Sequence, residues 1–281
     1  MGGPLKAIEV NQCNTCGVAT ADIQPPCLFQ FLNPTIRPIA TPSRRFNLVG
    51  MQFIRKEVEK LLAQGVIESS RSPWRAQVLV TKDERHKRRM VIVYSQTINR
   101  FTALNTYPLP RIDQQVNELA KCKWFSTLDL KSACYQVPLA TEDRAYTSFE
   151  ADGKLYQYCR LPFGVTNGVS CFQIIIDSVI ADNDLKQTFA YLDNITIGGF
   201  DKADHDRHFK KFLDATSKIN LTFNDAKSVV AVTEIDILGY RISQGSISPD
   251  PERLCPLIQL PIPKLSKQLK RCLGMFAYYA R

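Results

Sequence analysis

Apolar residues repeat at helical spacing in four separate stretches of the chain. The first stretch stops at Gly65, a residue type that commonly ends helices. This spacing predicts four helices that each bury one face. The apolar positions that define them are Ile54, Val58, Leu61 and Leu62; Ile112, Val116 and Leu119; Val169, Phe172, Ile176, Val179 and Ile180; and Phe209, Phe212, Leu213 and Ile219.

Short runs of strand-forming residues lie between these helices. Residues 77–82 and 89–94 flank a cluster of basic residues and predict a hairpin with a cationic tip. Residues 125–130 predict another strand, residues 146–161 an extended region, and the segment around Tyr191 a second hairpin. Because hairpins take the place of repeated crossovers, the order of elements favours the α+β class with an antiparallel sheet.

The length and composition of the chain indicate a folded protein. With 281 residues, 44% of them hydrophobic, it can bury a substantial core, and two or three packed subdomains are expected. Residues 1–43 contain several prolines and no sustained periodicity, so they predict a poorly ordered leader. We find no apolar run long enough to cross a bilayer, no signal peptide and no myristoylation signal. We therefore expect an intracellular protein, cytoplasmic or nuclear, without a membrane partner.

The nine cysteines indicate the redox compartment. They are odd in number and scattered, which fits a reducing compartment better than a disulfide framework. Cys13, Cys16 and Cys27 could begin a zinc site, but no second Cys or His pair follows at zinc-finger spacing. Most of the cysteines are therefore expected to be small core residues.

The net charge of +9 is concentrated in one segment. Residues 44–100 contain 13 Lys or Arg against 5 Asp or Glu, a net charge of +8. A solvated charged face usually mixes both signs, whereas Arg85-His86-Lys87-Arg88-Arg89 is a cluster of one sign. The segment therefore favours binding to a polyanion such as nucleic acid.

Two isolated carboxylates interrupt apolar segments. Asp129 lies within the run 125–130, where a charge has to be paired, exposed at a strand end or bound to a cation. Asp193 lies in Tyr191-Leu192-Asp193-Asn194-Ile195, and Asp-Asn is also ordinary hairpin-turn chemistry. Together the two aspartates predict a site for two hard cations, magnesium rather than zinc, of the kind that catalyses nucleotidyl transfer.

Six sequence blocks occur in the order and spacing of one protein family. With them the chain, over residues 36–281, resembles the reverse transcriptase domain of gypsy-type (Metaviridae) long-terminal-repeat retrotransposon Pol polyproteins, which are related to retroviral reverse transcriptases. The blocks are Ser72-Pro73-Trp74, Tyr107-Pro108-Leu109-Pro110-Arg111-Ile112, Phe125-Ser126-Thr127-Leu128-Asp129-Leu130-Lys131-Ser132-Ala133, Leu161-Pro162-Phe163-Gly164-Val165-Thr166-Asn167, Tyr191-Leu192-Asp193 and Ile237-Leu238-Gly239-Tyr240.

The resemblance implies a fold, partners and cofactors. It implies an α+β right-hand polymerase with fingers, a palm made of an antiparallel sheet plus helices, and a truncated thumb. The implied boundaries are 44–104 and 137–167 for the fingers, 105–136 and 168–243 for the palm, and 244–281 for the partial thumb. The implied partners are dNTPs and an RNA or DNA template with its primer, and the implied cofactors are two Mg²⁺ ions, with Mn²⁺ as an alternative. The oligomeric state stays open.

The resemblance also implies roles for individual residues. Asp129 and Asp193 would bind the metal ions beside Asn194, and Lys227 is similar in position to a lysine proposed to protonate pyrophosphate, although it is equally well a solvated loop lysine. The implied nucleotide-binding residues are Arg89, which grips the triphosphate, Lys82 or Lys87, which would assist it, and Leu130, Cys134, Phe163 and Gly164. The implied primer grip comprises Leu238, Gly239 and Tyr240.

Four positions depart from the pattern of the family. Asn194 replaces the second of two adjacent aspartates, and it can offer an amide oxygen but no negative charge. Val93 and Asn105 also stand where the family usually or often has aspartate. Cys134 replaces the aromatic residue under the nucleotide sugar, whose ring normally excludes a 2′-hydroxyl. We hypothesise that Cys134 weakens discrimination against ribonucleotides.

Different interpretations of the function remain open from the sequence. The first is an RNA-directed DNA polymerase that extends a primer by a two-metal mechanism. The second is a catalytically inactive, truncated remnant that only binds nucleic acid through its basic fingers. Asn194, Val93 and Cys134 favour the remnant, whereas the intact blocks around Asp129 and Asp193 oppose it. An unexpressed genomic fragment is a third interpretation.

Overall fold

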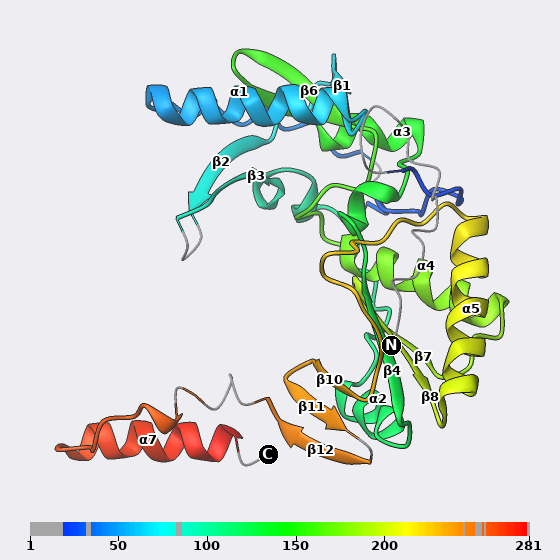
Figure 1. Cartoon of the computed structure of the whole chain (residues 1–281). Helices are drawn as coiled ribbons and strands as arrows, with labels where there is room; N and C mark the ends of the chain where they lie inside the picture. The colour runs from blue at the N-terminus through cyan, green and yellow to red at the C-terminus, as the bar shows by residue number, and fades with distance from the viewer. Residues whose placement is uncertain are drawn as a thin grey trace.

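The structure is a computed structural model that describes residues 19–31, 35–82, 86–243, 245–250, 255 and 257–279. Figure 1 shows α1 and strands β1 to β3 at one end of the molecule, strands β4, β7 and β8 beside helices α4 and α5 in the middle, and β10 to β12 with α7 at the other end. None of the helices in the described part of the chain is both long and apolar enough to cross a membrane.

Helices are interspersed with groups of two to four strands or with single strands along the described chain. The α-helices are α1 (Leu48–Ala63), α2 (Ile112–Leu119), α3 (Thr141–Arg144), α4 (Gly168–Asp182), α5 (Lys202–Lys218) and α7 (Ser266–Tyr279). The strands are β1 (Ile67–Ser69), β2 (Gln77–Lys82), β3 (Arg88–Val93), β4 (Trp124–Asp129), β5 (Phe149–Ala151), β6 (Lys154–Tyr158), β7 (Thr188–Tyr191), β8 (Asn194–Gly199), β9 (Val229–Val232), β10 (Glu234–Ile237), β11 (Tyr240–Ser243) and β12 (Ser246–Pro249). Short 3₁₀ helices, η1 (Tyr94–Gln96), η2 (Ile98–Arg100), η3 (Ala133–Gln136) and η4 (Ala145–Thr147), connect some of them.

The central sheet has four strands in the order β7-β8-β4-β9, and every neighbouring pair is antiparallel. Its inner strand β8 is buried except at its first residue, Asn194, and both Ile195 and Ile197 are fully buried. Helix α5 packs on β8 and β4, and α4 packs on β7. An apolar inner strand covered by amphipathic helices is how the periodic patterns in the sequence bury their surface.

Smaller sheets lie on either side of the central sheet in Figure 1. At one end, β2 and β3 form an antiparallel hairpin and β1, β6 and β5 form a three-stranded sheet beside α1. At the other end, β10, β11 and β12 form an antiparallel sheet. All regular sheets in the described residues are antiparallel, so the fold is α+β, as the sequence predicted.

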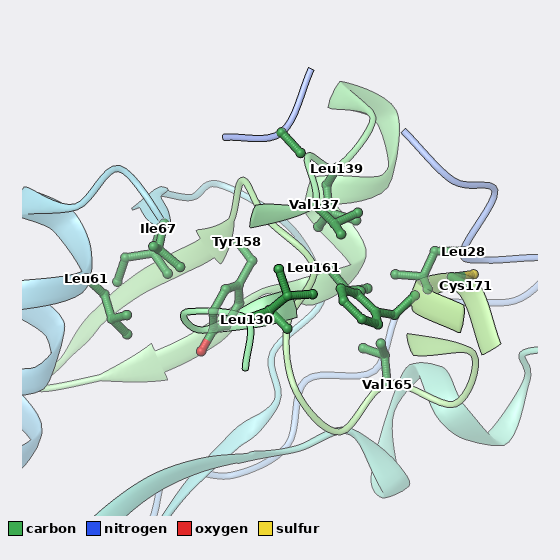
Figure 2. Close-up of a cluster of buried hydrophobic side chains, with 14 of the residues drawn as sticks. Leu28, Leu61, Ile67, Leu130, Val137, Leu139, Tyr158, Leu161, Val165 and Cys171 are labelled. Atoms are coloured by element: carbon green, nitrogen blue, oxygen red, sulfur yellow. The ribbon is translucent and has the colours of Figure 1, made fainter. Parts of the chain in front are cut away.

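One large hydrophobic core joins the α1 end to the central sheet. Figure 2 shows part of it, with Leu61 and Ile67 at one side, Leu130 and Leu161 in the middle, and Leu28 at the other side. A second, smaller cluster lies between α2 and the β10–β11 hairpin and is made of Val116, Leu119, Cys122, Phe125, Ile235 and Ile242. Because Phe125 lies in β4 of the central sheet, this cluster packs the sheet of β10, β11 and β12 against the central sheet.

The prediction of a poorly ordered leader over residues 1–43 is wrong for much of this interval. Residues 1–18 and 32–34 lie outside the described residues, but Leu28 is fully buried in the main core. The Ala21 amide donates to the Gln136 carbonyl at 2.8 Å, and the Asp22 amide donates to the Ile219 carbonyl at 2.9 Å. The sequence pattern did not predict this order, because a segment without helices or strands can be held in place by tertiary contacts alone.

Two other local predictions need adjustment. The extended region predicted over residues 146–161 is a hairpin of two short strands, β5 and β6. Leu62, assigned to the apolar face of the first helix, is 38% exposed, whereas Ile54, Val58 and Leu61 are buried. The helix itself continues upstream to Asn47, whose side chain caps it by accepting a hydrogen bond from the Gly50 amide.

Candidate active site

Asp129 lies at the end of β4, next to the turn between β7 and β8. Strand pairing places Asp129 opposite Asn194, and the Leu130 amide donates a hydrogen bond of 3.1 Å to the Asp193 carbonyl. Because hydrogen-bonded and non-hydrogen-bonded pairs alternate along an antiparallel ladder, Asp129 and Asn194 form a non-hydrogen-bonded pair, in which side chains approach closely. The structure thus brings Asp129, Asp193 and Asn194 together at one end of the central sheet. Leu130 contributes only its backbone, since its side chain is 2% exposed and lies in the core (Figure 2).

The turn that carries Asp193 has an unusual backbone. Leu192 has a φ of +56°, and Asp193 is not among the residues with positive φ. Positive φ at only the first central residue is the pattern of a type II′ turn, which normally has glycine there. A non-glycine residue in such a conformation costs roughly 1–3 kcal/mol and persists only when its surroundings hold it in place. The Leu192 amide is held by the Gln173 side chain, whose Oε1 accepts its hydrogen bond at 2.9 Å.

The Asp129 carboxylate lies beside the ammonium group of Lys227. Its side chain is 17% exposed, and the Lys227 Nζ atom lies 3.4 Å from its Oδ2 atom. The loop that carries Lys227 is tied to the same strand, because the Asn224 amide donates to the Asp129 carbonyl at 2.8 Å and the Lys227 amide donates to the Asn224 carbonyl at 3.1 Å. Asp193 and Asn194 are exposed. The cluster is therefore open to solvent on one side and anchored by backbone on the other.

Cys134 lies in η3, the first element after β4. Burial, together with a smaller effect of the Asp193 charge, raises the pKa of the Cys134 thiol to about 11. The thiol is therefore uncharged at neutral pH and presents a small apolar surface near Asp193.

Phe163 and Gly164 form the turn predicted from Pro162-Phe163-Gly164. The Phe163 side chain is 57% exposed, and its ring meets the Tyr135 ring at a centroid distance of 5.3 Å in an edge-to-face arrangement. Gly164 has a φ of +88°, a conformation that favours glycine, and its carbonyl accepts a hydrogen bond of 2.8 Å from the Asn99 side chain. Asn99 thus fixes a turn that presents an exposed aromatic ring.

The β2–β3 hairpin carries the basic residues, and its register bears on their predicted roles. Thr81 pairs with Arg89, whereas Lys82 pairs with Arg88. Because side chains alternate between the two faces of a hairpin, Lys82 lies on the opposite face from Arg89. The register therefore disfavours the prediction that Lys82 assists Arg89. Lys87 is the other lysine predicted to assist Arg89. Arg85 lies outside the described residues.

Leu238, Gly239 and Tyr240 occupy the turn between β10 and β11 and the first residue of β11. Leu238 and Gly239 have φ values of +52° and +88°, the pattern of a type I′ turn. The Gly239 carbonyl accepts a hydrogen bond of 3.1 Å from the Asp250 amide. Tyr240 packs against the smaller core cluster. The predicted primer-grip residues thus belong to the sheet of β10, β11 and β12.

The residues at this end of the central sheet fit magnesium. Mg²⁺ usually takes one or two protein carboxylates and completes its shell with water and substrate phosphates. Asp129 and Asp193 supply two carboxylates, and Asn194 adds an amide oxygen. Among the described residues, no three His, Cys, Asp or Glu side chains gather into a cluster that could enclose an ion. Because Asp129, Asp193 and Asn194 all offer oxygen donors, the donor set suits a hard cation better than zinc.

A second group of reactive residue types proves to be structural. The Ser126 hydroxyl lies 2.8 Å from His205 Nε2, and His205 Nδ1 lies 3.1 Å from an Asp206 carboxylate oxygen, an order typical of hydrolase triads. Ser126 and His205 are both fully buried, and the Ser126 oxygen also accepts a hydrogen bond from the Ala231 amide. This serine is enclosed by protein on every side, so the series serves packing between β4 and α5.

Sequence reasoning missed Gln173 and Asn99. Gln173 could have been found, because it is a polar residue between Phe172 and Ile176 on the apolar side of a predicted helix, and a buried amide needs partners. Asn99 could not, because its role depends on a contact between segments 65 residues apart.

Comparisons with known proteins agree with this geometry. The family model for reverse transcriptase (RNA-dependent DNA polymerase) matches residues 80–242, more than half of the chain. The chain is 30% identical over 280 residues to the retrovirus-related Pol polyprotein from transposon gypsy of Drosophila melanogaster, covering 98% of this chain and 26% of the relative. It is 31% identical over 232 residues to the Pol polyprotein from transposon opus of the same organism, covering 81% and 23%. The chain thus spans about a quarter of these relatives.

Solved structures show the same fold. The foamy viral protease-reverse transcriptase in complex with double-stranded DNA has a TM-score of 0.80 and 21% identity, covering 93% of this chain and 45% of that chain. The same viral protein with an RNA/DNA hybrid has a TM-score of 0.78 and 21% identity, covering 93% and 34%. The fold is therefore the α+β fold of right-hand polymerases. The chain belongs to the reverse transcriptase (RNA-dependent DNA polymerase) family, and its sequence is of the gypsy-type retrotransposon kind.

Proposed function

We propose that this chain is the polymerase part of a retrotransposon Pol polyprotein and extends a primer with dNTPs on an RNA or DNA template. The observation that carries the proposal is the placement of Asp129 and Asp193 at one end of the central sheet, joined through the hydrogen bond from the Leu130 amide to the Asp193 carbonyl. Two carboxylates at an open strand end are the protein's part of a two-metal nucleotidyl transfer site.

Asp129, Asp193 and the amide oxygen of Asn194 would hold Mg²⁺, or Mn²⁺ in its place. When bound, the metal ions activate the primer 3′-oxygen and neutralise charge on the phosphates. Lys227, fixed beside Asp129, is placed to meet negative charge that develops on the departing pyrophosphate. Arg89, on the exposed face of the hairpin, and Lys87 after the hairpin tip would bind the triphosphate.

The nucleotide sugar and base would lie between Cys134 and the Phe163-Gly164 turn. Cys134 is small and uncharged at neutral pH, so it leaves more room under the sugar than an aromatic side chain does. Exposed Phe163 offers a ring on which a base or sugar can pack. We expect this pocket to admit ribonucleotides more readily than one with tyrosine at position 134. Ribonucleotide incorporation by the chain no better than by Cys134→Tyr would contradict that expectation.

The nucleic acid would lie across the three parts of the fold. We assign fingers to 44–104 and 137–167, palm to 105–136 and 168–243, and part of the thumb to 244–281, with Leu238, Gly239 and Tyr240 holding the primer end. The net charge of +8 over residues 44–100 supports a phosphate-binding surface on the fingers. Solved relatives with double-stranded DNA and with an RNA/DNA hybrid support a duplex partner.

The second candidate is a remnant that binds nucleic acid without catalysis. The asparagine at position 194 favours this candidate. Asn194 is paired with Asp129, and it lacks the negative charge that an aspartate at this position would bring to the site. Losing a residue that supports a metal ligand typically lowers metal affinity or activity by about 10- to 100-fold. The intact pair of Asp129 and Asp193 supports the active enzyme instead.

Magnesium-dependent primer extension on an RNA template tests the proposal. The unchanged chain is compared with Asp129→Ala and with Asn194→Asp. Extension by the unchanged chain that Asp129→Ala abolishes would support the polymerase and show that asparagine is tolerated. Extension only by Asn194→Asp would mean that one residue disabled the site, and absence of extension in all three would favour the binding remnant.

A further inference from the structure

The strained turn at Leu192 depends on a side chain from the neighbouring helix. Gln173 of α4 is fully buried, and its Oε1 accepts the hydrogen bond of the Leu192 amide at 2.9 Å. Its Nε2 donates to the carbonyl of Ala190 in β7 at 3.3 Å. One amide group therefore bonds to Ala190 in β7 and to Leu192 in the turn, immediately before Asp193.

Asp177 determines which way the Gln173 amide points. Gln173 Nε2 also donates to Asp177 Oδ1 at 2.9 Å, and an ionised carboxylate can only accept hydrogen bonds. The nitrogen of Gln173 must therefore face Asp177, which leaves its oxygen facing the Leu192 amide. Gln173 and Asp177 are four residues apart on α4, so they lie on the same face of that helix.

Tyr107 anchors the other end of this series. Its hydroxyl donates to Asp177 Oδ2 at 2.7 Å, and this hydrogen bond is the main reason that the pKa of Tyr107 is raised. Tyr107 comes from the segment before α2, and its own amide donates to the Asn105 side chain at 2.9 Å. Both carboxylate oxygens of Asp177 are thus occupied by donors from separate parts of the chain.

We propose that Tyr107, Asp177 and Gln173 form a positioning relay that holds the Leu192-Asp193 turn in its strained conformation and so sets where the Asp193 carboxylate lies. The three residues touch neither metal nor nucleotide in this scheme and act through the Leu192 amide. The inference rests on the proposed function for its catalytic consequence but not for its structural one.

A purely structural role would give a different pattern of effects. Gln115 of α2 also donates to the Ala190 carbonyl, at 3.0 Å, but it makes no bond to the Leu192 amide or to Asp177. Gln115→Met therefore removes a hydrogen bond of similar length to the same strand and leaves the relay intact. It serves as the matched control for Gln173→Met, in which a side chain of similar size loses its polar atoms.

Amide hydrogen exchange tests the relay without any need for activity. In the full chain, Gln173→Met is expected to speed exchange of the Leu192 amide at least about tenfold, because its acceptor is lost. Tyr107→Phe should speed it about threefold, and Gln115→Met should leave it unchanged. Exchange within β4 and α5 should not change in any variant. Unchanged Leu192 exchange in Tyr107→Phe would overturn the relay, and this variant retains the packing of the ring.

Single-nucleotide incorporation then tests the catalytic consequence. Gln173→Met is expected to lower kcat about tenfold or more and to raise the Mg²⁺ concentration for half-maximal rate, with the KM for dNTP within about twofold. Tyr107→Phe should lower kcat about threefold alone and have no further effect in the Gln173→Met background, because the relay is already broken. Multiplying effects in the double variant would contradict the proposal. If the unchanged chain extends no primer, the proposed function fails, while the exchange experiment still decides the relay.

Discussion

Two hairpin turns of the chain place a leucine at positive φ, and they differ in the residue that follows the leucine and in the contacts of the turn. The turn between β10 and β11 continues from Leu238 into Gly239, so both central residues have positive φ and the second one is glycine. The turn between β7 and β8 continues from Leu192 into Asp193, and it relies on the buried Gln173 side chain for its amide. In the first turn glycine takes one of the two positive-φ positions, and the Asp250 amide donates to the Gly239 carbonyl. The second turn is stabilised by a helix beneath it, which leaves its residues free to carry chemistry.

The two turns differ in where the sequence is constrained. At the β10–β11 turn the constraint is local, because glycine accepts the backbone conformation without strain. At the β7–β8 turn an aspartate takes the second position, and the constraint is transferred to Gln173 and its partners on α4. The glycine of the first turn is visible in the local sequence, whereas the support of the second turn is a polar residue within a distant helix.

The largest expected effect is loss of the carboxylate in the β7–β8 turn. Asp193→Ala should lower the rate of single-nucleotide incorporation by more than about 100-fold, because even residues that only support a metal ligand contribute about 10- to 100-fold. Asp236→Asn, beside the other turn, is the control. Asp236 is exposed and paired with Arg241 at 2.7 Å, so its loss should change the rate by less than about twofold. Similar losses in both variants would contradict the distinction between the turns.

The next effect concerns the residue opposite Asp129. Asn194→Asp adds a third carboxylate to the cluster, and it should lower the Mg²⁺ concentration for half-maximal rate by about tenfold. The measurement is the incorporation rate across a magnesium titration. A magnesium requirement that stays the same would show that Asn194 is an accepted member of this site.

A stability effect of about 1 kcal/mol is expected at the glycine of the β10–β11 turn. Gly239→Ala forces a side chain into the left-handed region at a φ of +88°, which should lower the melting temperature by about 2 °C. Gly274→Ala, within α7, meets no atom within 4 Å and should leave the melting temperature unchanged or raise it, since alanine favours helix. Thermal unfolding followed by circular dichroism measures both. Shifts of the same sign would contradict the role assigned to Gly239.

The smallest expected effect is a change in the titration of Cys134. Its pKa of about 11 keeps the thiol protonated at neutral pH, so alkylation by iodoacetamide should rise about tenfold per pH unit up to pH 10. Since the Asp193 charge contributes to the raised pKa, Asp193→Asn should move this profile to lower pH, and Asp236→Asn should not. Mass spectrometry of the labelled peptide measures the rate. A profile that Asp193→Asn does not move would place Asp193 away from the pocket.

Much of the fold could be predicted from local patterns. Residues 77–82 and the helix marked by Val116 and Leu119 follow from periodicity, and the structure has β2 and α2 there. The burial of Leu28 in the main core could not be predicted, because an irregular, proline-containing segment has no periodic pattern that shows which side chains are buried. The sequence also identified Asp129 and Asp193, and the structure places them together, while their catalytic roles remain predictions.

Strand register and long-range hydrogen bonds account for what the sequence could not show. A shift of one residue moves a side chain to the other face of a strand, so the sequence could not tell whether Thr81 or Lys82 shares a face with Arg89. The bond between Tyr107 and Asp177 joins segments 70 residues apart. No local pattern encodes such a contact.

Affinity cleavage with Fe²⁺ tests whether metal ions bind between Asp129 and Asp193. Fe²⁺ replaces Mg²⁺ in open oxygen-donor sites, and with ascorbate and peroxide it cuts the backbone near the bound ion. We predict fragments that end close to residues 129 and 193, that are suppressed by excess Mg²⁺ and that are absent in Asp129→Ala. Cuts elsewhere only, or cuts at these positions that persist in Asp129→Ala, would contradict a metal site between the two aspartates.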